Sequence, residues 1–236
     1  MFPLGVLNKK IYWATLLELR FEGSNGSQVF KDSSKYNRTV NVITGTPIIS
    51  TTNPLSGSSS LLLGTNGTIS IPNFTTPVNT KLRTIEFRIQ IDLDDIAFNE
   101  SQGVFIKGYA SYYGSTYSYY CVLSRNASGT GGKLYTSVYA LDVGTNLLHI
   151  SIADLSANNH VAITRRSNGY FAYLNGVVVD SFASTSSYAN NTYDLYIGET
   201  IADPVTSIMT NKFKGRLDNF KLYNINRYPN DFTPPA

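Results

Sequence analysis

Residues 160–182, HVAITRRSNGYFAYLNGVVVDSF, encode two consecutive β-hairpins and decide the fold. Residues 160–166 run from apolar Val161, Ala162 and Ile163 into polar residues 164–166, and Ser167-Asn168-Gly169 supplies residues that tolerate positive φ in a tight turn. A second strand follows over 171–174, and Asn175-Gly176, a strong hairpin signal, starts the β-branched run 177–179. Three strands in so short a stretch leave no room for crossover helices, which need a dozen residues or more. The stretch therefore predicts antiparallel sheet.

The rest of the chain continues this pattern of short strands and polar turns. Leu17, Leu19 and Phe21 alternate with charged residues, and residues 85–91 alternate in the same way. We expect further strands at 61–63, 68–71, 104–107, 117–124, 133–140, 147–153, 193–197 and 213–223, with long loops at 50–60 and 200–211. About a dozen strands favour two packed antiparallel sheets, with binding sites on the rim loops.

Length and composition indicate one all-β domain. The chain has 236 residues, of which 15% are charged, and it is rich in turn-forming and strand-forming residues. We expect residues 15–236 to form a single domain and residues 1–14 to form an N-terminal arm. The arm is either an edge strand of the same sandwich or a segment that docks on a partner.

Charge and cysteine content exclude several classes of function. The net charge of +3 comes from 19 basic and 16 acidic residues spread along the chain, so the sequence lacks the basic patch of a nucleic-acid binder. Lys9 and Lys10 interrupt the first 15 residues, so we expect these residues not to form a signal peptide, and no segment has the ~18 apolar residues of a membrane span. Cys121 is the single cysteine and is expected to be a buried free thiol.

Four stretches, in order along the chain, resemble the concanavalin A-like, laminin G-like jelly-roll family. Residues 160–176 are similar to its His-Val-Ala strand and Tyr-Leu-Asn-Gly turn. The other similar stretches are 17–23 (LELRFEG) with 30–34 (FKDSS), 83–89 (RTIEFRI) and 213–223 (FKGRLDNFKLY). The resemblance covers nearly the whole chain and implies a two-sheet antiparallel jelly-roll sandwich. The tail 227–235 (RYPNDFTPP) is similar to versions found in tailed-bacteriophage proteins.

The family includes glycoside hydrolases, so catalysis has to be considered. Retaining hydrolysis needs two carboxylates about 5–5.5 Å apart, and the family's glucanases carry them in a Glu-x-Asp-x-x-Glu strand. The crowded acids here, Asp92, Asp94 and Asp95, have neither that spacing nor a glutamate, and they are typical of turn chemistry. The resemblance makes His160 a packed structural histidine. We therefore expect no enzyme activity, with a polysaccharide-degrading enzyme as an alternative.

The resemblance also implies one structural Ca²⁺. Glu22, Asp32 and Asp218 fall on acidic positions of the family, and backbone carbonyls would complete the 6–8 oxygen ligands that Ca²⁺ takes. The alternative is that Asp32 caps a turn and Asp218 pairs with a basic side chain.

Tyrosines are concentrated in one segment. The candidates for glycan or partner contact are Tyr109, Tyr112, Tyr113, Tyr117, Tyr119 and Tyr120. Tyrosine rings stack on sugar faces and anchor interfaces, but they also form cross-strand pairs that stabilise a sheet, and both interpretations stay open.

These observations lead to one functional hypothesis and two alternatives. We expect a non-enzymatic bacteriophage virion protein, on the capsid or a tail fibre, that is assembled in the host cytoplasm. It would bind surface glycans weakly through many copies and contact other virion proteins, without binding nucleic acid or membranes. The alternatives are a purely structural decoration subunit and the polysaccharide-degrading enzyme.

Overall fold

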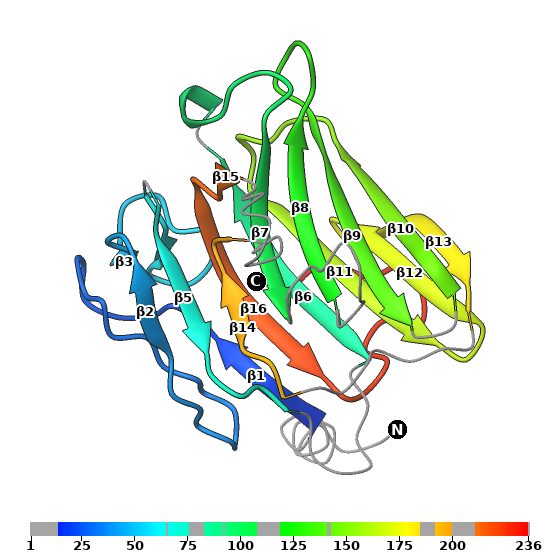
Figure 1. Cartoon of the computed structure of the whole chain (residues 1–236), viewed down its shortest axis with the longest axis horizontal. Helices are drawn as coiled ribbons and strands as arrows, with labels where there is room; N and C mark the ends of the chain where they lie inside the picture. The colour runs from blue at the N-terminus through cyan, green and yellow to red at the C-terminus, as the bar shows by residue number, and fades with distance from the viewer. Residues whose placement is uncertain are drawn as a thin grey trace.

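The computed structural model describes residues 14–64, 66–75, 83–91, 93–107, 119–140, 143–184, 192–199 and 211–235. These residues form two eight-stranded sheets that stack as layers, together with one 3-10 helix, η1 (Leu93–Asp95) (Figure 1). The predicted all-β jelly-roll sandwich is confirmed. Within the described residues, no helix has the length and apolar character needed to cross a membrane.

The first sheet has the strand order β13-β12-β11-β6-β16-β4-β3, and β1 also pairs with β16. Its strands are β1 (Thr15–Leu19), β3 (Ile48–Ser50), β4 (Ser60–Leu62), β6 (Thr84–Gln90), β11 (Asn159–Arg166), β12 (Gly169–Leu174), β13 (Val177–Ala183) and β16 (Arg216–Tyr223). All of these pairings are antiparallel.

The second sheet has the strand order β10-β9-β8-β7-β14-β5-β2, and β15 pairs with β7 in parallel. Its strands are β2 (Asn41–Thr44), β5 (Thr68–Ile71), β7 (Ser101–Lys107), β8 (Tyr119–Arg125), β9 (Gly132–Ala140), β10 (Val143–Ile152), β14 (Leu195–Ile197) and β15 (Asn211–Lys212).

The core lies between the sheets. Phe87 from β6 and Phe220 from β16 meet Phe105 from β7, with ring centroids 5.3–6.0 Å apart. Cys121 is also buried, as predicted, and burial raises the pKa of its thiol. Because the strands alternate, the residues between these core positions point to the outer faces of the two sheets.

The predicted double hairpin is confirmed as β11, β12 and β13. Asn175 and Gly176 both have positive φ, and the side chain of Asn175 accepts a hydrogen bond of 2.8 Å from the backbone nitrogen of His160. The first turn differs from the prediction, because Ser167 and Asn168 do not have positive φ. Gly169 serves close packing instead: a Cβ there would lie 2.2 Å from the carbonyl oxygen of Phe182 on β13.

The C-terminal tail, residues 227–235, lies across the outer face of the first sheet. Tyr228 and Phe232 stack with ring centroids 3.6 Å apart, and Tyr228 packs with Ala162 and Tyr173 of that face. The backbone nitrogen of Phe232 donates a 2.9 Å hydrogen bond to the carbonyl of Gly176, at the β12–β13 turn. The tail therefore acts as a further layer on the sandwich.

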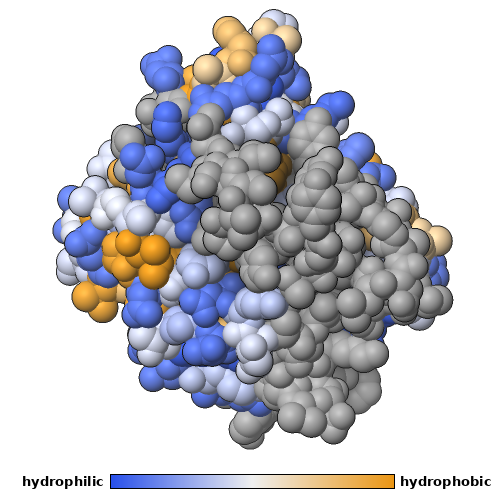
Figure 2. All heavy atoms as spheres, in the orientation of Figure 1, coloured by the Kyte–Doolittle hydropathy of each residue, from blue (hydrophilic) through white to orange (hydrophobic). Residues whose placement is uncertain are grey.

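Both sheets end in strands with exposed apolar side chains. On β2, Val42 and Ile43 are 38% and 46% exposed, and Figure 2 shows an apolar patch over this strand, at the left of the view. On β13 the exposed residues are Val177, Val178 and Val179. The backbone nitrogen of Val178 donates to Asp231 (3.0 Å), and that of Ser181 donates to the side chain of Asp180 (2.7 Å).

Some strand predictions were incomplete. β2 and β3 were not predicted, because each is short and lies among polar residues. The predicted strand 213–223 begins at Arg216, and the preceding pair Asn211–Lys212 joins the other sheet. The loop between β3 and β4 is confirmed, whereas residues 200–210 and nearly all of the predicted N-terminal arm lie outside the described residues.

Candidate functional site

The predicted tyrosine cluster is only partly described. Tyr109, Tyr112, Tyr113 and Tyr117 lie outside the described residues. Tyr119 points into the core, where it is 2% exposed and contacts Phe105 edge-on, so its predicted role as a surface contact is wrong. Tyr120 is the next residue on β8, and it faces the outer side half-buried.

The three predicted calcium ligands do not come together as one site. Asp32 accepts hydrogen bonds from the backbone nitrogens of Glu18, Ser34 and Arg38 at 2.8–3.0 Å. Asp32 therefore caps a turn, as the alternative to a calcium ligand predicted. Glu22 and Asp218 instead bind neighbouring residues of one segment, 58–60. Among the described residues, no three acidic, histidine or cysteine side chains form a group suited to a metal.

Asp218 is fully buried, and this alters its titration. Its carboxylate accepts hydrogen bonds from Ser60 (3.2 Å) and from the backbone nitrogen of Asn219 (2.7 Å). Burial, with a smaller contribution from the charge of Glu22, raises the pKa of Asp218 to about 7 against the opposing effect of these hydrogen bonds. In the part of the chain that the structure describes, no ion pair joins Asp218 to a basic side chain, so the predicted alternative of an Asp218 ion pair is not observed.

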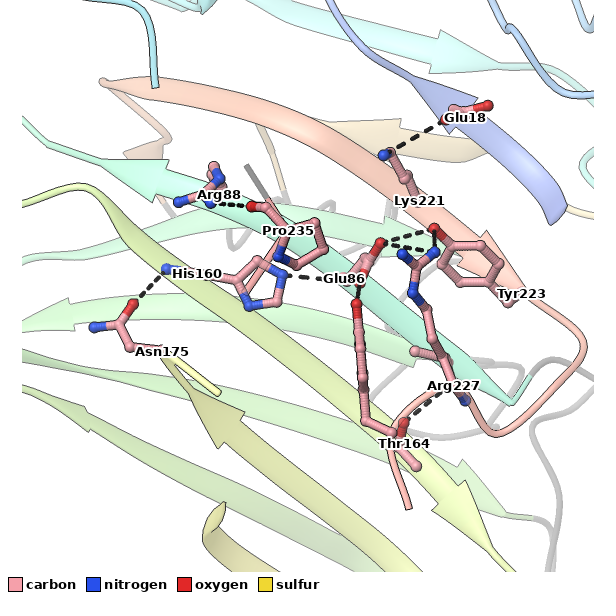
Figure 3. Close-up of polar contacts among 12 residues, drawn as sticks. Glu18, Glu86, Arg88, His160, Thr164, Asn175, Lys221, Tyr223, Arg227 and Pro235 are labelled. Carbon is pink, nitrogen blue, oxygen red and sulfur yellow. Dashed lines mark hydrogen bonds and ion pairs between the residues drawn. The ribbon is translucent and has the colours of Figure 1, made fainter. Parts of the chain in front are cut away.

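A second buried carboxylate, Glu86, lies beneath the tail (Figure 3). Tyr223 donates a 2.7 Å hydrogen bond to it, Tyr228 donates another, and Arg227 and His160 lie 3.6 and 3.8 Å away. Burial alone would raise the pKa of Glu86, but the polar contact with His160, the charge of Arg227 and the two tyrosine hydroxyls hold it at about 2. His160 is therefore a packed residue, as predicted, and this network holds the tail on the sheet.

A more open arrangement lies at one end of the sandwich. The β8–β9 turn and η1 meet there, at the upper end of Figure 1, beside the segment that connects β10 to β11. The position is a rim of the kind that carries binding sites on a rigid sandwich. Two cavities open there.

The first cavity, which we call the rim pocket, has a volume of about 550 Å³. This volume is within the range of small-molecule sites. Its polar lining comes from Asn53, Gln90, Asp94, Ser156 and Arg216, and its apolar lining from Leu62, Ile91 and Leu93. Arg216 donates to Ser50 (3.1 Å), and Gln90 donates to the carbonyl of Ser156 (2.6 Å). Guanidinium donors and carboxylate acceptors therefore line the same cavity.

An exposed aromatic ring follows η1 in the chain, and Arg125 links it to Leu93 of the pocket lining. Phe98 is 53% exposed, and the guanidinium of Arg125 lies 4.2 Å from its ring centroid. Arg125 also donates to the carbonyl of Leu93 (2.6 Å), the first residue of η1, and to that of Gly129 (3.3 Å), in the β8–β9 turn. One arginine thus joins the two rim loops and supports the ring.

The second cavity, which we call the hairpin pocket, has a volume of about 450 Å³. It is lined by the β8–β9 turn, including Asn126, by Lys133 at the start of β9, and by Ser151 and Ala153 at the end of β10 and just after it. Its surface is mostly backbone and small polar side chains.

The arrangement can be compared with known proteins. Residues 63–231 match the family model described as the concanavalin A-like lectin/glucanases superfamily. The chain belongs to this superfamily. Among curated proteins, none matches the chain by sequence.

Solved structures with the same fold include lectin-like binding domains. The receptor-binding domain of botulinum neurotoxin D is similar to this superfamily member with a TM-score of 0.65 and 11% identity, over 92% of this chain and 50% of the toxin domain. Domain 4 of an extracellular arabinanase from Geobacillus stearothermophilus, solved with arabinotriose, has a TM-score of 0.57 and 13% identity, over 89% and 92% of the two chains. The ligand-binding domain of neurotoxin D, solved with N-acetylneuraminic acid, has a TM-score of 0.59 and 13% identity, over 92% and 49%. The chain thus spans about half the length of the toxin domains.

Sequence reasoning missed the rim residues of this superfamily member. The lining of the rim pocket comes from segments more than 160 residues apart in the chain, from Asn53 to Arg216, and forms no motif. One usable signal was Phe98, an aromatic residue in a stretch of acidic and small residues outside any predicted strand.

Proposed function

We propose that this protein is a non-catalytic, lectin-like protein that binds glycans at its rim, on the surface of a tailed-bacteriophage particle. The rim pocket carries this proposal. A sugar hydroxyl both donates and accepts, so neighbouring hydroxyls match the donors of Arg216 and the acceptors of Asp94. Phe98 adds a flat apolar surface for the face of a sugar ring.

The structural neighbours support a glycan ligand. Two of them were solved with sugars, N-acetylneuraminic acid in a neurotoxin domain and arabinotriose in an arabinanase domain. A single open pocket would bind weakly, and many copies on one particle would raise the overall affinity by about 10²–10⁴.

The buried position of Glu86 makes this carboxylate unsuited to hydrolysis. This carboxylate is 2% exposed and held by the tail, so a substrate does not reach it. The release of reducing sugar from bound polysaccharide would instead support the enzyme alternative.

The particle location rests on the resemblance of residues 227–235 to bacteriophage sequences. In this proposal the protein assembles in the host cytoplasm and contacts other virion proteins in several copies. Mass spectrometry of purified particles is the test. Absence of the protein from particles that otherwise contain their full set of structural proteins would refute the virion location and leave the glycan proposal in place.

The Phe98→Ala variant tests the glycan site. We expect it to weaken glycan binding about tenfold or more, because a stacked aromatic ring typically contributes over 1 kcal/mol at a contact. Its free energy of unfolding should fall by less than about 1 kcal/mol, since the ring is 53% exposed and a cation–π contact at such a site contributes about 0.5–1 kcal/mol. A glycan panel read by calorimetry measures the affinity. Arg20→Gln is the control, since Arg20 is an exposed cation outside both pockets.

The exposed edges favour a second candidate function, a structural decoration subunit. The apolar side chains on β2 and β13 would then pack against the particle or a sister subunit. A well-folded sample that binds no glycan but is present in purified particles would favour this candidate.

A structural Ca²⁺ is a separate proposal. Glu22 and Asp218 are its remaining side-chain ligands, since Asp32 is engaged in its turn. We expect Ca²⁺ at about 100 times its dissociation constant to add about 2.7 kcal/mol to the free energy of unfolding. Asp218→Asn should abolish this gain. A melting temperature of the wild type that does not change with added CaCl2 would refute the calcium site.

A further inference from the structure

The two cavities of the rim lie on either side of one short segment of the chain. Ala153 lines the hairpin pocket and Ser156 lines the rim pocket, and the two residues are only three positions apart. A fully extended chain advances at most about 3.6 Å per residue, so these walls are no more than about 11 Å apart. We call the segment 153–156 the ridge.

Hydrogen bonds fix the ridge to both pockets. Leu155 donates from its backbone nitrogen to the carbonyl of Thr130, in the hairpin pocket, at 2.9 Å. Its carbonyl accepts from the backbone nitrogen of Ile91, in the rim pocket, also at 2.9 Å. The backbone nitrogen and hydroxyl of Ser156 donate to Asp154 at 2.9 and 2.6 Å, which closes the turn. The two cavities therefore keep a fixed spacing, which is what binding two parts of one ligand requires.

The two pockets offer different but compatible chemistry. Arg216 and Asp94 give the rim pocket both signs of charge, and Lys133 with small polar groups lines the hairpin pocket. Neither pocket is dominated by acidic or basic side chains, so hydroxyl groups match the lining better than a highly charged ligand. Each cavity alone has the volume of a small-molecule site.

From this arrangement we infer that the ligand is the interior of an extended neutral oligosaccharide, which crosses the ridge and occupies both pockets. This inference rests on the proposed glycan-binding function and specifies its ligand as a chain of several units rather than a terminal sugar. The hairpin pocket, with Lys133 and the β8–β9 turn, is then a second subsite.

The test is the dependence of affinity on chain length. Arabino-, xylo- and cello-oligosaccharides, from single sugars to chains of about six units, are titrated against the full-length protein by calorimetry. We expect the longest chains of the best series to bind at least about tenfold tighter than its single sugar, because they fill a second pocket.

Matched variants assign the two subsites. Arg216→Gln should weaken binding at every chain length, whereas Lys133→Gln should weaken the binding of long chains more than that of short ones. Arg20→Gln, outside both pockets, should leave all affinities unchanged. Melting temperatures show that each variant is folded.

The outcomes separate this inference from the proposed function. Equal affinity for single sugars and long chains, with Arg216→Gln still weakening binding, would overturn the two-subsite inference and leave the glycan proposal standing. An equal effect of Lys133→Gln at all lengths would also overturn the inference. Binding of no sugar from this panel or from a wider glycan panel by a folded sample would refute the proposed function itself.

Discussion

Replacing Glu86 by glutamine is expected to lower the free energy of unfolding by about 3–5 kcal/mol, the usual effect of removing one partner from a buried charged network. The variant leaves the guanidinium of Arg227 without its carboxylate in a site that Tyr223 and Tyr228 enclose. Chemical denaturation at neutral pH measures the change. The matched control is Glu18→Gln on the same sheet face, because Glu18 pairs with Arg20 and Lys221 nearer the solvent.

The control should lose clearly less than Glu86→Gln, because Glu18 is 14% exposed against 2% for Glu86 and its partner Arg20 is 57% exposed, so solvent screens that pair. The wild type gives a second readout through pH. The pKa of Glu86 lies at about 2 in the folded protein, below its ordinary value of 4.5. Its stabilising effect is therefore complete above pH 4.5 and is lost as the pH falls from there towards 2. Glu86→Gln should flatten this part of the stability profile. Equal losses in the two variants would contradict the assigned role of Glu86.

Replacing Gly176 by alanine is expected to lower the free energy of unfolding by about 3 kcal/mol and to release the tail. The new Cβ would lie 1.8 Å from the carbonyl oxygen of Phe232, so either the tail or the turn has to move. The left-handed conformation of residue 176 (φ 86°) adds about 1–2 kcal/mol of strain. Hydrogen exchange over residues 227–235 and denaturation measure the two effects.

Gly129→Ala is the matched control for this variant. Gly129 has a similar φ of 78°, but a Cβ at this position meets no atom within 4 Å. It should therefore show the conformational strain alone, with the tail still protected from exchange. Protection of the tail in Gly176→Ala that equals the wild type would contradict the proposed docking of Phe232 against the turn.

The sequence predicted local features of the fold well. The short apolar and β-branched runs in 160–182 and the Asn175-Gly176 turn between them located β11, β12 and β13, since hairpins depend on neighbouring residues. The sheet to which each strand belongs was harder to predict. Residues 61–63 and 68–71 flank one short turn, yet β4 and β5 belong to different sheets. The local sequence pattern does not show that the chain passes from one sheet to the other between these two strands.

The functional features depend on contacts distant in the chain. Alternation along β6 places Glu86 on the outer face, where a carboxylate would normally be solvated. It is buried because the tail, about 140 residues later, covers it. The rim pocket likewise combines ordinary polar residues from separate segments. Tyr119 was accessible to prediction, because it alternates with Tyr120 and one of the two had to face the core.

The hydrogen bonds that aspartate side chains accept from β13, at the edge of the first sheet, affect how the protein behaves at high local concentration. An unprotected strand edge with apolar side chains is a template on which further chains add, which leads to fibres. Asp231 and Asp180 occupy two backbone nitrogens of β13, so a second chain finds fewer donors there. The three exposed valines can thus face a neighbouring molecule without directing the growth of a continuous sheet. This property suits a protein displayed at high density, where colloidal stability matters as much as the stability of the single fold.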